Sequence, residues 1–559
     1  MQRDSGSQVF TPKILSVLRE GYDLGKFRCD AVAGLTVAIV ALPLAMALGI
    51  ASGASPEKGL ITAVIAGFLI SALGGSRVQI GGPTGAFVVV IFNVIAQHGY
   101  DGLLLATLLA GLILIVAGYA KLGQVIKFIP HPVITGFTAG IAVIIASSQV
   151  KDFLGLRTGK VPADFLLQWG TYWQALDSIS WTTLIVGAAS LAVIILLRRI
   201  APRAPGFLIA VVGASVAVTL LGLPVETIGS RFPDIQAGLP MPALPEFSVA
   251  KIRQVLPSAF TIAFLAGIEA LLSAVVADGM TGTRHRSNQE LVGQGVANIA
   301  SALFGGLPAT GAIARTATNI KAGGLTPVSG MCHATFVLLF VLFASDLMAY
   351  VPMAALAAIL FVVAWGMSEY ERFIGLMRMP NGDRGVLLLT FGLTVFVDLT
   401  VAIGVGVTIA SLLFMMRMSE SVQIEDVRKV VPDAELDSDD LQQRDSLPDG
   451  VEVFRINGPF FFGVAGDLLD TLRRVGQRPR VIILRMRLVP LLDASGVRAV
   501  GEFIRQAGVG GTRIILSGVQ AQPAEMLRRA HLGGDSSKVL YASDYAAALV
   551  LARDVLSAE

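Results

Sequence analysis

The sequence predicts a polytopic α-helical membrane protein that ends in a soluble α/β domain. Three observations lead to this fold class. Hydrophobic residues make up 54% of the 559 residues and charged residues only 15%, and the mean hydropathy is +0.71. Apolar runs of helical length recur from residue 31 to residue 418, and the composition then turns acidic and polar. A formal net charge of +3 is too small to indicate binding to nucleic acid.

Fourteen apolar segments can be counted between residues 31 and 418, and several are shorter than the roughly 20 residues that a full crossing needs. The first carries Pro43 near its middle, where a proline indicates a kink. Seven segments fall in a first repeat at about 31–225 and seven in a second at about 254–418. The segments lie at about 31–51, 59–73, 84–96, 103–120, 133–148, 183–197, 207–223, 256–277, 291–303, 310–320, 328–344, 354–366, 385–397 and 401–416.

Lysines and arginines between the segments predict the orientation. If residues 1–30 form a cytoplasmic N-terminal segment, the basic loops all fall on the cytoplasmic side. The Trp-containing stretch 151–181 and the Pro-rich stretch 223–248 then become external loops. Because seven is an odd number of spans, the two repeats are inverted relative to each other. The basic loops hold Arg77, Lys121 with Lys127, Arg198 to Arg203, Arg284 with Arg286, Lys321, and Arg372 to Arg384.

Two short segments follow breaks in the chain that nearly repeat each other. GGPTGA at Gly81–Ala86 introduces the third segment, and GGLPATGA at Gly305–Ala312 introduces the tenth. A helix that restarts after such a break offers unpaired N–H groups and the positive end of its dipole, which suit an anion. Paired broken helices in two halves point to a secondary transporter. The alternative is a chance match of small residues that let helices pack closely.

Two ionisable residues lie inside apolar segments, where an unpaired charge costs several kcal/mol. Glu269 lies in AFLAGIEALLSAVV, and Arg315 lies one to two turns into the restarted helix. They could pair with each other or with backbone carbonyls and only hold helices together. In the functional interpretation, Arg315 and the helix N-termini hold an anion, and Glu269 takes up a proton because loss of water favours a neutral carboxyl group. Hydroxyls of Thr84, Thr310 and Ser273 could bond the anion or local carbonyls.

Other chemistry finds little support in the sequence. The five histidines are scattered, and no HExxH, Walker A or GxSxG pattern occurs. We therefore expect neither an enzyme nor an ATP-driven pump, with no metal and no cofactor. Cys29 and Cys332 are far apart and suggest no disulfide framework.

Residues 419–450 are predicted to be a linker and residues 451–559 a soluble α/β domain, which fourteen spans would place on the cytoplasmic side. Ser495 in LDASGV lies beside Asp493 at a strand-to-helix turn, a position typical of a helix N-cap. The predicted strands lie at 451–457, 480–485 and 512–516, and the predicted helices at 463–475, 494–506 and 522–530.

Five stretches of the chain carry a resemblance to a known family. They are AGLTVAIVALPLAMALGIASG from Ala33, GGSRVQIGGPTGAFVV from Gly74, DGMTGTRHRSNQELVGQGVANI from Asp278, LPATGAIARTATN and FVDLTVAIGVG. The chain resembles the sulfate permease (SulP) family, solute carrier family 26, along nearly its whole length and looks most similar to bacterial proton-coupled C4-dicarboxylate members. The resemblance implies a uracil-transporter-like fold with a core that moves against a gate, a C-terminal STAS domain from about Val451, and a homodimer.

The resemblance also implies a substrate site between the two half-helices. Arg315 falls where many members have a substrate-facing arginine, and Glu269 falls where proton-coupled members carry an acid. Ala314 replaces a serine seen in some relatives, and Ser495 occupies the STAS position phosphorylated in soluble anti-sigma-factor antagonists. The substrate-binding residues that it implies are Leu42, Pro43, Leu48, Thr84, Gly85, Ala86, Glu269, Ser273, Thr310, Gly311, Ala312, Ala314 and Arg315.

We therefore expect an anion symporter in a bacterial inner (cytoplasmic) membrane that carries a C4-dicarboxylate such as fumarate or succinate together with H⁺ by alternating access. Sulfate or bicarbonate is the alternative substrate within the same family. A membrane-anchored regulatory protein, in which the STAS domain is the working part, is the alternative from a different class.

Overall fold

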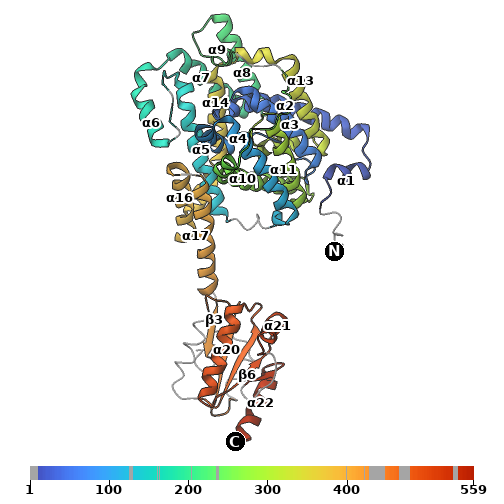
Figure 1. Ribbon diagram of the computed structural model, residues 1–559, viewed down its shortest axis with the longest axis vertical. Coiled ribbons are helices and arrows are strands. Elements are labelled where there is room, and N and C mark those ends of the chain that lie inside the picture. The colour runs from blue at the N-terminus through green and yellow to red at the C-terminus, as the bar shows by residue number, and fades with distance from the viewer. Residues whose placement is uncertain are drawn as a thin grey trace. The chain divides into compact units, whose positions relative to one another are not determined.

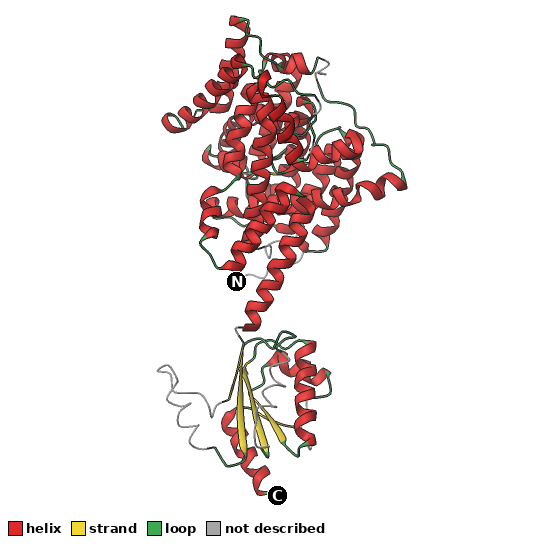
Figure 2. Cartoon of the chain, turned by 90° about the vertical axis from the view of Figure 1, so that its left-hand side faces the viewer, coloured by secondary structure: helices red, strands yellow, loops and turns green. Residues whose placement is uncertain are grey.

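The chain forms two compact units, Met1–Ala410 and Ser411–Glu559 (Figure 1). Helices build the first unit, and the second contains a five-stranded sheet (Figure 2). The computed structural model describes residues 10–124, 130–159, 161–162, 164–202, 204–233, 238–397, 399–420, 422–426, 447–464, 479–532 and 539–558.

The helices of the first unit match the fourteen predicted segments in order. The third and fourth segments are the two arms of α4, which bends at Gly99, where φ is 73° and ψ is 176°. The helices are α1 (Lys13–Arg19), α2 (Leu24–Ala51), α3 (Pro56–Leu73), α4 (Phe87–Tyr119), α5 (His131–Leu154), α6 (Phe165–Gln174), α7 (Trp181–Ile200), α8 (Gly206–Leu221), α9 (Ile228–Arg231), α10 (Val249–Thr281), α11 (Ser287–Leu303), α12 (Ile313–Lys321), α13 (Pro327–Phe343), α14 (Met353–Met367), α15 (Tyr370–Met377), α16 (Asn381–Phe396) and α17 (Leu399–Glu420).

Among the described residues, eight helices are long and apolar enough to cross a membrane. Polar side chains begin several of them. Asp23 accepts a hydrogen bond from Lys26 N at the start of α2, and Ser248 accepts one from Lys251 N at the start of α10. Such caps satisfy N–H groups that have no partner within the helix. The short helices α1, α6, α9 and α15 were not predicted. Membrane spans were located as long runs of apolar residues, and amphipathic or one-turn helices contain no such run.

The two broken helices meet in a two-stranded antiparallel ladder. Strand β1 (Gly81–Gly82) pairs with strand β2 (Thr310–Gly311). Beside the ladder, Ala312 N donates to Ile80 O at 2.8 Å. A Cβ atom on Gly311 would lie 1.5 Å from Nε2 of Gln79. The two segments can therefore approach this closely only because residue 311 is a glycine. The ladder places the starts of α4 and α12 next to each other.

One side of the helix bundle carries the N-terminal helix. Lys13 N in α1 donates to Gly74 O after α3 at 3.0 Å, and the Nη1 of Arg286 before α11 donates to Thr11 O at 2.8 Å. We call this side the N-terminal face. The ends of α3 and α10 and the start of α11 therefore lie on it.

The turn before α5 lies on the N-terminal face, because Gly123 N donates to Asn288 Oδ1 at the start of α11 at 3.2 Å. Helix α5 runs from there to the opposite face, which carries its end and the starts of α7 and α14. Since α7 and α14 begin there and cross the bundle, both end on the N-terminal face. The contacts that define the opposite face are Ser180 N to Leu154 O at 3.0 Å, Met353 N to Glu226 O at 2.9 Å, and the Arg231–Asp152 ion pair at 2.7 Å.

The helices pack as two bundles, and each bundle takes helices from both repeats. In the core bundle, α11 packs on α3 and α4, α13 packs on α2 and α3, and α10 packs on α4 and α12. In the gate bundle, α5 packs on α14 and α16, and α7 packs on α8 and α14. Helix α2 meets α8 and α14 where the bundles adjoin.

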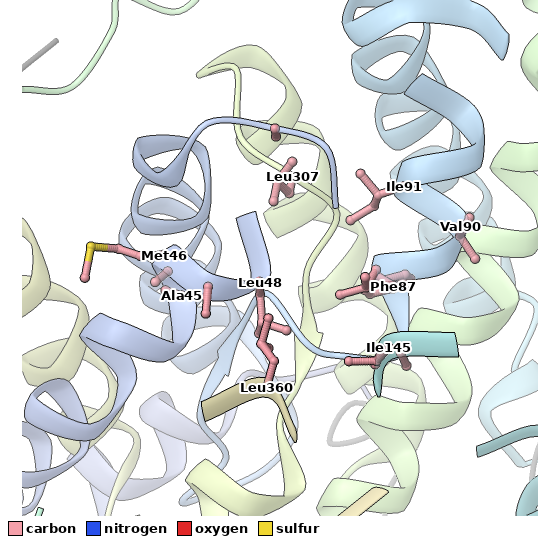
Figure 3. Close-up of a cluster of buried hydrophobic side chains, with 14 of the residues drawn as sticks. Ala45, Met46, Leu48, Phe87, Val90, Ile91, Ile145, Leu307 and Leu360 are labelled. Atoms are coloured by element: carbon pink, nitrogen blue, oxygen red, sulfur yellow. The ribbon is translucent and has the colours of Figure 1, made fainter. Parts of the chain in front are cut away.

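Large apolar side chains fill the space around the ladder. Phe87 begins α4, Leu307 precedes β2, and both are fully buried. Figure 3 shows them beside Leu48 of α2, with Ile145 of α5 and Leu360 of α14 in the same cluster. The cluster therefore includes side chains of both bundles.

The second unit is a sheet in the order β3-β4-β5-β6-β7. Strand β3 is antiparallel to β4, and the other neighbouring strands are parallel to each other. Alternate residues of β5 face two apolar clusters, one formed with α20 and α21 and the other with α22. Most of the predicted linker and of the helix at 463–475 lies outside the described residues. The elements are β3 (Gln423–Asp426), β4 (Val451–Asn457), β5 (Val481–Leu488), α20 (Ala494–Val509), β6 (Arg513–Ser517), α21 (Ala521–Arg529), β7 (Val539–Ala542) and α22 (Tyr545–Ser557).

A buried carboxylate fixes the link between α3 and β1. Glu290 of α11 is fully buried. Its Oε2 accepts hydrogen bonds from Gly75 N at 2.8 Å and Ser76 N at 3.1 Å, and its Oε1 accepts one from Gln294 Nε2 at 2.8 Å. The side chain thereby satisfies two backbone groups of a loop that lies between buried helices.

We expect Glu290→Ala to lower the free energy of unfolding by about 2–4 kcal/mol, because it leaves two buried N–H groups without acceptors. Thermal unfolding of the purified protein in detergent measures the loss. Glu290→Gln keeps an acceptor oxygen and should cost less, and Glu371→Ala at an exposed position of α15 is the control. Equal melting temperatures for Glu290→Ala and Glu371→Ala would contradict this role.

Candidate functional site

A cavity of about 720 Å³ lies where the two bundles adjoin. Side chains of α2, α10 and α12 and the residues 83–86 that lead into α4 line it from the core bundle, and side chains of α5, α7, α8 and α14 line it from the gate bundle. The start of each half-helix contributes to the wall. The predicted site residues in the lining are Leu48, Thr84, Gly85, Ala86, Glu269, Gly311, Ala312, Ala314 and Arg315.

Arg315 is anchored to the first repeat. It lies in the first turn of α12 and is 3% exposed, and its Nη2 donates to Pro83 O at 2.5 Å. A Cβ atom on Gly82 would lie 2.7 Å from its Nη1, so glycine makes room for the guanidinium. Within the described chain, the buried Nε of Arg315 has no hydrogen-bond partner. The side chain therefore retains hydrogen-bonding capacity for a ligand.

Glu269 is held by the residues that lead into α4. It lies on α10, and Thr84 Oγ1 donates to its Oε2 at 2.8 Å. Across the residues that the structure covers, Glu269 and Arg315 form no ion pair. The alternative in which the two charges pair directly is therefore not the arrangement seen here. The carboxyl group of Glu269 and the guanidinium of Arg315 therefore line the same cavity, and each is hydrogen-bonded to a different residue.

Four predicted site residues do not line the cavity. Thr310 Oγ1 donates to Ala266 O at 2.8 Å, and Ser273 Oγ lies 3.2 Å from Thr316 Oγ1. These hydroxyls join α10 to the ladder and to α12. Leu42 and Pro43 are on α2 but outside the lining, whereas Leu48 on the same helix is part of it.

In the second unit, the structure assigns the helix cap to Asp493. Its Oδ1 accepts a hydrogen bond from Gly496 N at 2.7 Å at the start of α20. Ser495 lies in the first turn of α20 and is exposed. Its hydroxyl is therefore accessible, and phosphorylation there stays a prediction.

Sequence reasoning missed cavity residues of the gate bundle. Arg198 of α7 and Glu369 after α14 both line the cavity, near the ends of helices that finish on the N-terminal face. Arg198 had been noted only as part of a basic loop. Thr138 of α5 and Met367 of α14 are also in the lining. Wall residues that are spread over several apolar helices carry no local signal for a shared cavity.

Two family descriptions match the chain. Residues 27–390 match the sulfate permease family, and residues 445–542 match the STAS domain. The putative sulfate transporter YvdB of Bacillus subtilis (strain 168) is 42% identical over 517 residues, which cover 92% of this chain and 95% of that protein. The bicarbonate transporter BicA of Synechocystis sp. is 33% identical over 521 residues, which cover 89% and 90%.

Solved structures agree with this match. The transmembrane domain of a cyanobacterial bicarbonate transporter, BicA, gives a TM-score of 0.62 at 34% identity and covers 68% of this chain and 98% of that one. The murine Slc26a9 anion transporter in its inward-facing state gives a TM-score of 0.86 at 18% identity, covering 99% and 96%, a likeness of fold alone. The predicted fold class is confirmed. The chain belongs to the sulfate permease family, whose members are membrane anion transporters and not enzymes.

Proposed function

We propose that the protein is a secondary active transporter that carries a small oxyanion, sulfate or bicarbonate, by alternating access of the cavity between the core and gate bundles. The observation that carries this proposal is the position of Arg315, buried at the start of one half-helix and bonded to the other repeat. The relatives described as sulfate and bicarbonate transporters favour these two anions over the C4-dicarboxylate that we expected.

The helix starts add to the attraction for an anion. The residues before α4 and α12 are Ala86 and Ala312, and neither makes a side-chain cap in the described structure. At α4, Phe87 N and Val88 N donate to Thr84 O and Gly85 O at 3.3 and 3.1 Å. The positive dipole ends of both helices face the cavity lined by Arg315. An oxyanion there would accept hydrogen bonds from the first turn of α12 and from the guanidinium.

Glu269 supplies a means of coupling transport to protons. An ionised Glu269 in the same cavity repels an anion, and protonation removes that repulsion. Proton binding and anion binding then favour each other, which is the requirement for symport. Thr84 Oγ1 links the carboxyl group to the residues that lead into α4 and line the cavity.

We also propose that the N-terminal face is cytoplasmic, in a bacterial inner membrane, and that the protein is a homodimer. Basic residues such as Arg77 and Arg286 lie at this face, as the positive-inside rule requires. Cys29, which is exposed near the start of α2, can report the orientation through a membrane-impermeant thiol reagent. Labelling of Cys29 from outside intact cells would reverse the assignment.

Arg315→Gln should weaken anion binding by roughly ten- to a hundredfold, because hydrogen bonds to charged groups contribute about 1.5–3 kcal/mol each. Equilibrium binding of radiolabelled sulfate and bicarbonate to the purified protein measures the change, with fumarate and succinate in the same panel. Lys321→Gln, at the exposed end of the same helix, is the matched control. Unchanged affinity in Arg315→Gln would move the site elsewhere, and preferential binding of fumarate would restore the dicarboxylate assignment.

Glu269→Gln should make uptake insensitive to a pH gradient, because the amide holds no exchangeable charge. In proteoliposomes, a more acidic exterior should accelerate uptake by the unmodified protein and leave the variant at a rate set by the anion gradient alone. Glu57→Gln, outside the cavity lining, serves as the control. Retention of the full pH-gradient effect by Glu269→Gln would refute proton coupling at this residue.

A further inference from the structure

A second cationic side chain lines the cavity at its gate-bundle wall. Arg198 is in the last turn of α7, and its guanidinium carbon lies 5.5 Å from the centroid of the Phe207 ring of α8. Both residues line the cavity. The aromatic face holds the guanidinium without neutralising its charge. In the part of the chain that is described, Arg198 forms no ion pair with an acidic side chain.

Neither acidic residue of the described lining forms an ion pair with Arg198. Glu369 lines the same cavity, and its Oε1 lies 2.6 Å from Nη1 of Arg372. Glu269 accepts the hydrogen bond from Thr84 described above. Glu369 is offset by its own partner, so among the described lining residues Arg198 and Arg315 are the cations without an ion-pair partner.

The rest of the lining strengthens the field of these cations. Much of the wall is apolar, and low-dielectric walls concentrate the field lines of a charged cleft. Because α7 ends on the N-terminal face, Arg198 lies toward that face. Arg315 lies at the ladder in the middle of the core bundle. An anion that enters from the N-terminal face therefore meets Arg198 before Arg315.

We propose that Arg198 forms an anion-capture site at the N-terminal-face end of the cavity. The site takes the transported oxyanion and hands it to Arg315. Because Arg198 belongs to the gate bundle and Arg315 to the core bundle, the capture site serves only the state that opens to the N-terminal face. This sidedness rests on the alternating access proposed above, whereas the electrostatic role of Arg198 does not. A lipid phosphate shares the chemistry of this site, and the test separates the two.

The test compares an anionic with a cationic methanethiosulfonate reagent at a cysteine placed in the cavity. Thr318 of α12 lines the cavity, and its hydroxyl bonds only within its own helix to Ala314 O, so Thr318→Cys is a suitable probe position in a Cys29→Ser, Cys332→Ala background. Arg198→Gln should lower the ratio of the anionic to the cationic reaction rate by roughly tenfold at low salt.

Arg199→Gln is the matched control, because Arg199 is the next residue of α7 and does not line the cavity. It should leave the rate ratio unchanged, and Arg198→Lys should preserve most of it. An equal ratio in Arg198→Gln and Arg199→Gln overturns the proposal. In nanodiscs, loss of the Arg198 effect when anionic lipid replaces zwitterionic lipid would assign the site to a lipid headgroup and also overturn it.

Transport of radiolabelled sulfate in oriented proteoliposomes tests the sidedness. Arg198→Gln should raise the half-saturating concentration several-fold from the N-terminal face only, and Arg315→Gln should raise it from both faces. Equal effects of Arg198→Gln from both faces contradict a capture site on the gate. No effect of Arg315→Gln would instead overturn the proposed central site, and the thiol measurement would still decide the role of Arg198.

Discussion

The structure of the first unit depends on how two interrupted helices satisfy their backbone in a membrane. Extended chain at membrane depth is tolerated only where protein supplies partners for its N–H and C=O groups. The pairing of β1 with β2 supplies some of them, and side chains supply others. Asn298 of α11 donates to Ala309 O at 2.9 Å and accepts from Ala309 N at 2.8 Å. Polar residues in α11 therefore stabilise the ladder.

The same arrangement creates the proposed anion site. Once the ladder uses the extended residues, the starts of α4 and α12 lie together without side-chain caps and face one cavity. Arg315 can be buried there because Pro83 O accepts its hydrogen bond and Gly82 leaves room for it. A buried guanidinium with an unpartnered Nε is costly in an apolar protein interior. That cost is consistent with a side chain retained to bind a ligand.

The division into two bundles underlies the proposed alternating access. The ladder, Glu269 and Arg315 belong to the core bundle, whereas Arg198 and Glu369 belong to the gate bundle. A displacement of one bundle against the other would change whether Arg198 and Arg315 face the same cavity. The apolar cluster around Phe87 includes side chains of both bundles, and apolar packing of this kind can slide without breaking specific hydrogen bonds.

The sequence by itself determined the membrane class, the number and order of the spans, the two breaks and the pair Glu269 and Arg315. These features are local: hydropathy locates the spans, Gly and Pro mark the breaks, and a charge within an apolar run is conspicuous. Only the tertiary structure decided which residues share the cavity. Thr310 and Ser273 bond within the protein, and Leu42 and Pro43 lie outside the lining. Arg198 enters the cavity, and Glu290 proves to hold a loop 214 residues away in sequence. Each of these outcomes depends on which helices pack together, and the packing of mostly apolar helices leaves little trace in the order of residues along any one of them.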